Sequence, residues 1–392
     1  MSEWQTKRLG DVLQLNYGKS LPLKSRVGGS IPVYGSNGVV GSHNYPIVDK
    51  PGLVVGRKGS AGEVHFSRGP FCPIDTTFYV TEDDAPDSDL EFLFYLLRHV
   101  DLRRITGDVG VPGLNREMAY MEPVRLPAAL PEQKKIAHIL STVQRAIEAQ
   151  ERIIQTTTEL KKALMNKLFT EGLRNEPQKQ TEIGPVPESW EVVELGSLAK
   201  VGNGSTPKRA NEAYWEDGTI PWLNSTKIHD RVITAADQFV TPQAVKECHL
   251  PKVAPNSLLI AITGQGKTLG NSAITRIETC INQHLAYAQF HSPNIAPDFV
   301  LWFMQTRYDY LRSIAHGGGS TKGALTCGFL KTLSIPVPST DEQKEIVTVF
   351  QTLDDKHDSA ASKQSALQDL FRTLLHELMT AKARVHDLPL TA

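Results

Sequence analysis

The stretch Glu132-Gln-Lys-Lys-Ile136 decides the fold, because it recurs as Glu342-Gln-Lys-Glu-Ile346, 210 residues further along the chain. From Glu132 to Thr170 there is no Gly or Pro, and apolar residues follow one another at steps of three and four. That spacing is typical of a helix with one narrow apolar seam. At 1.5 Å per residue, roughly forty residues make a rod of about 60 Å. The sequence therefore predicts two long helices.

The apolar positions of these helices form the predicted seam. A rod of this length cannot bury its seam alone, so we expect the two helices to bury their seams against each other. The alternative is that each helix lies separately on its own domain. Leu160 and Leu168 continue the pattern in the first helix, and Leu370 and Leu378 continue it in the second. The principal seam residues are Ile136, Leu140, Val143, Ile147, Ile154, Leu164, Ile346, Phe350, Leu353, Leu367 and Leu374.

Repetition extends over the rest of the chain. Trp4-Gln-Thr-Lys-Arg-Leu-Gly10 matches Trp190-Glu-Val-Val-Glu-Leu-Gly196, and later Cys72 matches Cys280. The offset between the copies grows from 186 to 208 over the first third of each copy and then barely changes. We infer a tandem duplication whose second copy carries about twenty extra residues within residues 204–255.

The first part of each copy has short apolar runs broken by Gly and Pro, which read as strands and turns. One apolar segment per copy, Glu91–Val100 and Asp298–Gln305, reads as a helix. The predicted fold class is α+β, with two tandem mixed α/β domains and two long helices in an internal repeat. We place the first domain at residues 1–130, the first long helix at 131–172, a linker and second domain at 173–338, and the second helix and tail at 339–392.

Composition excludes several classes of protein. Lys and Arg total 42 against 43 for Asp and Glu, so the charge balance counts against a nucleic-acid binder unless charge is segregated by face. The four cysteines lie far apart without a CxxC pair, which predicts reduced thiols and no metal site. The first residues lack an apolar signal segment, and no run approaches the roughly 20 apolar residues of a membrane span. We expect a cytoplasmic protein without a membrane partner.

Motifs that would carry catalysis are incomplete. Thr263-Gly-Gln-Gly-Lys-Thr268 resembles a phosphate-binding loop, but Ala261 stands where the first glycine of that loop belongs. Glu132 and Lys134 have the carboxylate-x-lysine spacing of metal-dependent nucleases, yet a glutamate in the first turn of a helix more simply favours the helix dipole. There is no HExxH, no G-x-S-x-G and no Asn-Pro-Pro-aromatic sequence. These absences favour a binding protein over an enzyme.

Several motifs together resemble the specificity subunit of type I restriction–modification systems, over nearly the whole chain. Thr181-Glu-Ile-Gly-Pro-Val-Pro-Glu-Ser-Trp190 looks like the opening of that family's second recognition domain, and Thr158-Glu-Leu160 looks like its spacer repeat. Proline before Glu-Gln-Lys-x-Ile is its recurring helix start, and Thr206-Pro-Lys208 is similar to its recognition-domain openings. The family's Thr-Gly-Lys helix ending stands here as Thr380-Ala-Lys382.

This resemblance implies a non-catalytic, DNA-binding subunit. It also implies that two long antiparallel coiled-coil helices separate the two mixed α/β domains in a pseudo-two-fold internal repeat. Each target recognition domain would read one half of a bipartite target in double-stranded DNA, and the helices would set the gap between the halves. Two methyltransferase subunits would dock on the chain and restriction subunits would join them. S-adenosylmethionine, ATP and Mg would be bound by those partners, and no cofactor by this chain.

Candidate base and phosphate contacts are polar and cationic residues on predicted turns, because Arg pairs best with guanine and Asn or Gln with adenine. Exposed amides around Lys267 also suit a phosphodiester backbone. Any one of them can equally be a solvated loop residue. The first copy contributes Ser36, Asn37, Arg57, Lys58, Asn115 and Arg116, and the second contributes Lys208, Lys227, Gln265, Lys267, Ser320, Thr321 and Lys322.

Alternatives remain at this point. One is the specificity subunit of a related system in which restriction and methylation share one polypeptide. Others are a self-contained nuclease or methyltransferase and a coiled-coil structural adaptor that reads no DNA.

Overall fold

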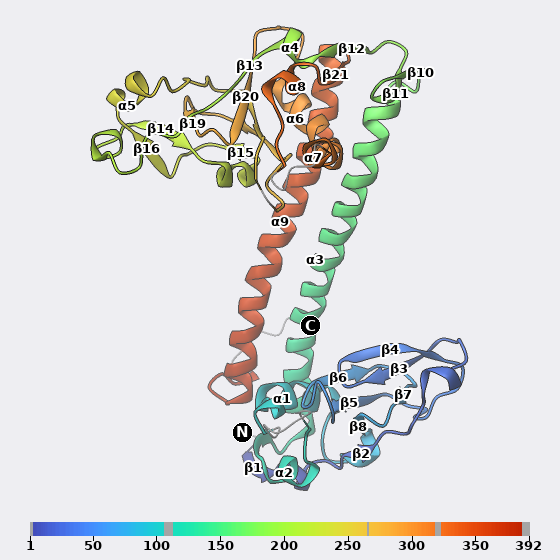
Figure 1. Cartoon of the computed structure of the whole chain (residues 1–392). Helices are drawn as coiled ribbons and strands as arrows, with labels where there is room; N and C mark the ends of the chain where they lie inside the picture. Colours follow the sequence, from blue (N-terminus) through green and yellow to red (C-terminus); the bar gives the residue numbers. More distant parts are fainter. Residues whose placement is uncertain (1–2, 106–112, 265, 318–322, 386–392) are drawn as a thin grey trace. The chain divides into compact units, whose positions relative to one another are not determined.

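The computed structural model describes residues 3–105, 113–264, 266–317 and 323–385. The chain divides into two compact units: unit 1 comprises residues 1–152 and 360–392, and unit 2 comprises residues 153–359. Both long helices of the prediction are present as α3 (Leu130–Glu171) and α9 (Thr340–Met379), drawn green and red in Figure 1. Each unit therefore contains one part of each helix.

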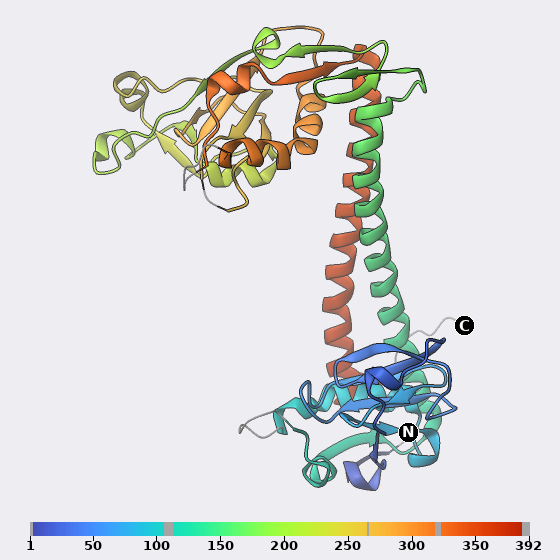
Figure 2. The same ribbon diagram turned by 45° about the vertical axis from the view of Figure 1, so that its right-hand side comes forward.

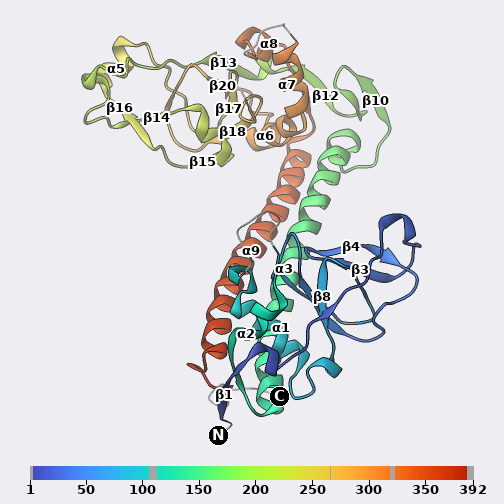
Figure 3. The same cartoon turned by 60° about the horizontal axis from the view of Figure 1, so that its bottom comes forward.

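Unit 1 contains two sheets and a strand pair. A four-stranded sheet has the order β2-β8-β5-β6, a three-stranded sheet has the order β4-β3-β7, and β1 pairs with β9. Figure 3 shows β3 and β4 on the side of this domain away from α1 and α2. The elements are β1 Trp4–Arg8, β2 Asn16–Tyr17, β3 Ile31–Gly35, β4 Gly38–His43, β5 Gly52–Gly56, β6 Val64–Ser67, β7 Cys72–Pro73, β8 Thr77–Val80, β9 Pro123–Pro127, α1 Leu90–Val100 and α2 Arg116–Met121.

Unit 2 repeats this topology with additions. Its sheets have the orders β13-β20-β17-β18-β15 and β16-β14-β19, β12 pairs with β21, and the hairpin β10–β11 lies beside the end of α3 (Figure 2). The strands are β10 Gln178–Thr181, β11 Gly184–Pro187, β12 Glu191–Glu194, β13 Ala199–Asn203, β14 Ile220–Leu223, β15 Val232–Ile233, β16 Gln238–Val240, β17 Ser257–Ala261, β18 Ser272–Thr275, β19 Cys280–Ile281, β20 Leu285–Phe290 and β21 Ser334–Val337. The helices are α4 Leu195–Leu198, α5 Pro242–Glu247, α6 Pro297–Thr306, α7 Tyr308–His316 and α8 Cys327–Lys331.

The inserted residues of the second copy form edge elements. The 3-10 helix η6 (Ser225–Asp230), strand β15 and helix α5 all lie within residues 204–255, where the sequence offset places the insertion. Residues 3–105 hold no counterpart of these three elements. The framework around them is repeated: the parallel pair Val33↔Cys72 in unit 1 recurs as Trp222↔Cys280 in unit 2. The two units therefore share one duplicated framework, and the second copy carries an insertion early in its sequence.

The long helices pack antiparallel within each unit. In unit 1, Ile136 and Leu140 near the start of α3 share a core with Leu378 near the end of α9. In unit 2, Leu168 near the end of α3 shares a core with Ile346 near the start of α9. The predicted antiparallel pair is therefore confirmed within both units.

Burial along the predicted seam is uneven. Ile136, Leu140, Ile147, Ile346 and Phe350 are buried. Val143, Ile154, Leu164, Leu353, Leu367 and Leu374 are half-buried. Leu160 and Leu370 are 45% and 46% exposed, so their assignment to the seam was wrong. The helical drift of a 3.6-residue turn against a 3.5-residue repeat carries such positions off the contact face.

The repeated Glu-Gln pair ties each helix start to its domain. Glu132 Oε1 accepts a hydrogen bond from Trp4 Nε1 at 3.1 Å, and Glu342 Oε2 accepts one from Trp190 Nε1 at 3.1 Å. Glu342 Oε1 also accepts from the backbone amide of Leu173, directly after the turn that ends α3. Glu132 therefore anchors a domain as well as standing in the first helical turn, where we predicted it.

The neighbouring glutamines are buried and bridge backbone groups. Gln133 Oε1 accepts from the amide of Asp89, which caps α1, and its Nε2 donates to Pro127 O at 3.0 Å. Gln343 Oε1 accepts from the amide of Ala296, the residue before α6, at 2.7 Å. These two glutamines fix where α1 and α6 begin relative to the long helices.

Candidate DNA interface

In unit 1, the loop after the buried strand β5 is held against the segment that leads into α2. Lys58 forms an isolated antiparallel bridge with Gly113, and the amide of Leu114 donates to Arg57 O at 2.9 Å. The loop therefore has a fixed backbone, although it lies between regular elements. Three of the predicted contact residues, Arg57, Lys58 and Asn115, lie on this loop and the facing segment.

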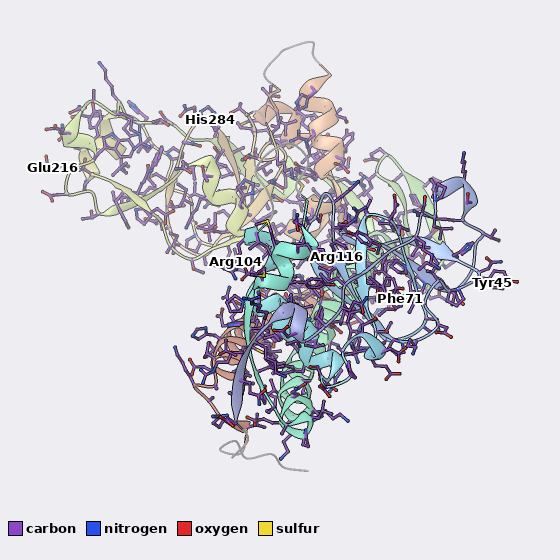
Figure 4. All side chains as sticks on the ribbon, turned by 90° about the horizontal axis from the view of Figure 1, so that it is seen from below. Tyr45, Phe71, Arg104, Arg116, Glu216 and His284 are labelled. Atoms are coloured by element: carbon purple, nitrogen blue, oxygen red, sulfur yellow. The ribbon has the colours of Figure 1, made fainter. Side chains whose placement is uncertain are left out.

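Arg57 and Arg116 both lie against the ring of Tyr17, a residue that was not among the predicted contact residues. Their guanidinium carbons lie 5.4 Å and 5.1 Å from the centroid of Tyr17, and Tyr17 is 52% exposed. Arg57 Nε donates to Asp75 O at 3.2 Å, and Arg116 Nε donates to Glu117 at 3.3 Å. Figure 4 shows Arg116 at the start of α2. We call Tyr17, Arg57 and Arg116 the Tyr17 cluster.

The other predicted residues of the first copy differ in exposure. Lys58 and Asn37 are exposed. Ser36 is 7% exposed and its hydroxyl donates to Thr76 O at 2.6 Å, so its placement does not fit a base contact. Asn115 Oδ1 accepts from two amides of the first turn of α2, at 2.9 and 3.1 Å. Its carbonyl oxygen is therefore used as a helix cap, a role that Asn commonly takes.

Unit 2 builds the same loop with different side chains. Thr263, after β17, forms an isolated antiparallel bridge with Ala324, and the amide of Leu325 donates to Ile262 O at 2.8 Å. The side chain of Thr326 then caps α8, as Asn115 caps α2. The backbone of this end of the sheet is thus repeated, while the residues that it displays are not.

The predicted cations of the second copy fall into two groups. Lys208 and Lys267 are exposed. Lys227 pairs with Asp230 at 2.8 Å and Asp237 at 3.2 Å, and the hydrogen bonds to these two carboxylates raise the pKa of Lys227. Its charge is already neutralised, which disfavours a phosphate contact. Gln265, Ser320, Thr321 and Lys322 lie outside the described residues.

Arg209 is a further cation that sequence reasoning missed. Its guanidinium carbon lies 3.9 Å from the ring centroid of Trp215 and 4.9 Å from that of Trp222, and its Nη2 donates to Gln238 at 2.7 Å. The signal was available, because Arg209 directly follows Lys208 and two tryptophans follow within fifteen residues. Arginine held by aromatic rings is preorganised for planar acceptors.

A chain of neutral polar side chains crosses the corresponding end of the unit 2 sheet. Thr206 donates to Gln283, Gln283 Nε2 lies 3.2 Å from His284 Nε2, and His284 Nδ1 contacts the hydroxyl of Thr263. Figure 4 labels His284 in this domain. These residues come from three loops that lie far apart in the sequence, so no local pattern indicates the cluster.

The two units therefore offer different chemistry at matching places. Unit 1 offers two guanidinium groups and a lysine, which suit phosphate or the O6 and N7 atoms of guanine. Unit 2 offers amide, hydroxyl and imidazole groups, which donate and accept in turn. Among the described residues there is no cluster of His, Cys, Asp and Glu that could hold a metal ion. In the same part of the chain, no helix combines the length and apolarity that crossing a bilayer requires.

Comparison with known proteins identifies the family. The family model described as the Type I restriction modification DNA specificity domain matches residues 1–158 and 187–368. The matched residues cover most of the chain and fall into two copies, as the duplication predicts. The chain therefore belongs to the type I restriction–modification DNA specificity family and is a specificity subunit.

Named relatives and a solved structure agree with this assignment. The chain is 24% identical to the type I restriction enzyme MjaVIII specificity subunit of Methanocaldococcus jannaschii, over 98% of this chain and 94% of that protein. It is 28% identical to the MjaIX specificity subunit of the same organism, over 49% of this chain and 44% of that protein. The S subunit of a type I restriction–modification system from M. genitalium shares the fold, with a TM-score of 0.68, 18% identity and 96% of both chains covered.

Proposed function

We propose that this chain reads a bipartite target in double-stranded DNA, with one half-site for each mixed domain. Residues 1–130 and 173–338 are the two target recognition domains in this proposal, and the helices within residues 131–172 and 339–392 set the gap. The observation that carries it is the repeated loop bridge, Lys58 with Gly113 and Thr263 with Ala324. One backbone framework presents two unlike sets of side chains, which is what two different half-sites require.

We further propose that the chain performs no reaction itself. Two methyltransferase subunits would dock on it and bind S-adenosylmethionine, and restriction subunits would bind ATP and Mg, all within the cytoplasm. With 42 basic and 43 acidic residues, the chain brings little net attraction for phosphate, so its partners would supply much of the neutralisation. The isolated chain should accordingly bind DNA weakly, and the salt dependence of binding should become steeper when the partner subunits are added.

The test exchanges residues 1–130 for those of a related specificity subunit and maps methylated adenines in cells that hold the partner subunits. One half of the methylated sequence should change while the other half and the gap stay the same. If both halves change, or neither does, the proposal is wrong.

Arg116→Ala is a narrower version of that test. It removes a guanidinium from the Tyr17 cluster, and loss of one arginine contact costs about 1–3 kcal/mol of discrimination at one base pair. Relaxed recognition should therefore appear only in the half-site read by residues 1–130. Lys246→Ala, an exposed change in the other domain, is the control.

A further inference from the structure

The sheet of unit 1 ends at a strand whose counterpart in unit 2 is covered. The order β2-β8-β5-β6 leaves β6 at the edge, whereas β13-β20-β17-β18-β15 continues one strand beyond β18. The offset of 208 that relates Cys72 to Cys280 also relates Phe66 in β6 to Ile274 in β18. Strand β6 is therefore the counterpart of β18, and unit 1 lacks the strand that covers it.

An ion pair at the end of each strand supports this register. Arg68, the residue after β6, pairs with Glu91 of α1 at 2.9 Å. Arg276, the residue after β18, pairs with Asp298 of α6 at 2.5 Å. The two edges therefore hold the same helix in the same way, and their surroundings can be compared residue by residue.

Strand β15 covers β18 with two backbone hydrogen bonds. It runs parallel to β18, with Val232 opposite Ile274. The amide of Ile274 donates to Arg231 O at 2.8 Å, and the amide of Arg276 donates to Ile233 O at 2.8 Å. Arg231, Val232 and Ile233 all lie within residues 204–255, where the second copy carries its extra residues.

The matching amides of unit 1 belong to Phe66 and Arg68. Among the described residues, neither amide donates to a backbone carbonyl outside the β5–β6 ladder. Beside this edge lies an open cleft of about 760 Å³, lined by residues of β6, α1, α3 and α9 that all belong to unit 1. Unpaired edge amides next to a cleft can accept a further strand.

In unit 2, a charged side chain anchors the covering strand to the helices. The guanidinium carbon of Arg231 lies 4.5 Å from the ring centroid of Trp302 on α6, and Arg231 pairs with Asp354 on α9. Lys161 on α3 pairs with the same carboxylate at 2.6 Å. The carboxylate of Asp354 thus holds the N-terminal end of β15 through Arg231.

In unit 1 that acid is absent and a cation stands close by. Gln144 occupies the place of Asp354 at the offset of 210, and Tyr95 occupies the place of Trp302 at 207. Both line the cleft. A strand that enters here meets an amide where the unit 2 strand meets a carboxylate.

The nearby cation is Arg98 on α1. Its guanidinium carbon lies 5.2 Å from the ring centroid of Phe94 and 5.5 Å from that of Phe371, and it forms no ion pair with a described residue. The acids that line the cleft have partners of their own: Asp101 with Arg103, Glu63 with His65, and Glu148 with Gln144. Charge complementarity therefore calls for an acidic group opposite Arg98.

We propose that the open edge of β6 receives an extended segment of a partner polypeptide, running parallel to β6, with an acidic residue facing Arg98 directly before two β-branched residues. The backbone of that segment would accept hydrogen bonds from the amides of Phe66 and Arg68, as β15 accepts them in unit 2. This proposal does not depend on which domain reads which bases, and it fails or stands separately from the half-site experiment.

The first test is hydrogen exchange of the full chain alone. The amides of Phe66 and Arg68 should exchange much faster than those of Ile274 and Arg276, which β15 protects. Slow exchange at Phe66 and Arg68 would mean that the edge is already covered, which would overturn the proposal.

The second test uses a synthetic peptide with the sequence of residues 229–236 and the change Arg231→Glu as the probe. It should protect Phe66 and Arg68 and bind the full chain about tenfold more tightly than the unchanged peptide, as a charged hydrogen bond predicts. In R98E the preference should reverse. K24E, the same charge change at an exposed residue outside the cleft, should leave it unaltered. Equal binding of both peptides, no binding, or no reversal in a folded R98E chain would each refute the proposal.

Discussion

Replacing Gln343 with Met should destabilise unit 2 strongly, although Gln343 contacts no DNA in our proposal. Its side chain is fully buried and makes three hydrogen bonds to backbone groups. Oε1 accepts from the amide of Ala296 at 2.7 Å, and Nε2 donates to Asn294 O at 2.8 Å and to Pro338 O at 2.9 Å. Methionine has nearly the same volume but can replace none of these bonds.

The structure allows the cost to be estimated and compared between units. Each buried backbone group left without a partner costs about 1–3 kcal/mol, so the amide of Ala296 and the carbonyl of Pro338 cost about 2–6 kcal/mol together. Asn294 is exposed, and loss of the bond to its carbonyl adds about 0.5–1.5 kcal/mol. Gln133 holds only two backbone groups, and Gln133→Met should therefore cost about 2–6 kcal/mol in unit 1. A domain is stable by about 5–15 kcal/mol, so Gln343→Met is expected to bring unit 2 close to unfolding at room temperature.

Urea denaturation measures this difference. Unit 2 contains four of the five tryptophans, so its unfolding dominates the fluorescence signal, and hydrogen exchange of unit 1 peptides reports the other unit. Gln155→Met is the matched control, because Gln155 is exposed and, among the described residues, its side chain bonds only to the Glu159 side chain on its own helix. A loss below about 1 kcal/mol for Gln343→Met, or a larger loss for Gln133→Met, would contradict the assigned role of the glutamines.

Three further predictions concern the helices. Ala381 has a φ of 57° after the end of α9, a left-handed conformation that glycine adopts without strain, so Ala381→Gly should raise the unfolding free energy of unit 1 by about 1 kcal/mol in urea. Burial, and to a lesser extent the charge of His376, lowers the pKa of His99, so His99 binds protons more readily in the unfolded chain than in the folded one. The free energy of unfolding should therefore fall as the pH drops below about 6.5. In thermal melts at several pH values, His99→Asn should make that fall smaller. Asp354→Asn leaves two cations without a carboxylate, and because these cations are 27% and 32% exposed it should cost about 1.5–3 kcal/mol. Exposed Asp355→Asn should cost less than about 0.5 kcal/mol.

The two long helices and the tandem domains could be predicted from the sequence because each pattern occurs twice along the chain. Each long helix was marked by periodicity, by the absence of Gly and Pro over about forty residues, and by a second copy with the same pattern. The insertion was visible as a change in offset. Periodicity could not predict the exposure of Leu160 and Leu370, because the apolar positions drift around the helix relative to the contact face.

Individual site residues were harder to predict, and the reason is physical. A short polar residue on a turn can serve either a ligand or the nearest unpaired backbone group, and its sequence neighbours look the same in both cases. Ser36 and Asn115 serve the backbone, and Lys227 is held by aspartates three and ten residues away. The Tyr17 cluster joins residues about forty and one hundred positions apart, which no local pattern can indicate.

The buried bonds of Glu342 and Gln343 also limit where the two copies can diverge. Any change at these positions leaves backbone groups without partners inside the core, so the helix starts must stay alike while the domains differ. An edge strand such as β15 can be gained without breaking an existing ladder, because it pairs only with the outer amides of β18. Divergence is therefore expected on loops and sheet edges, where half-site recognition and partner binding can change without loss of the shared framework. The covered edge of unit 2 and the open edge of unit 1 are the form that such divergence takes here.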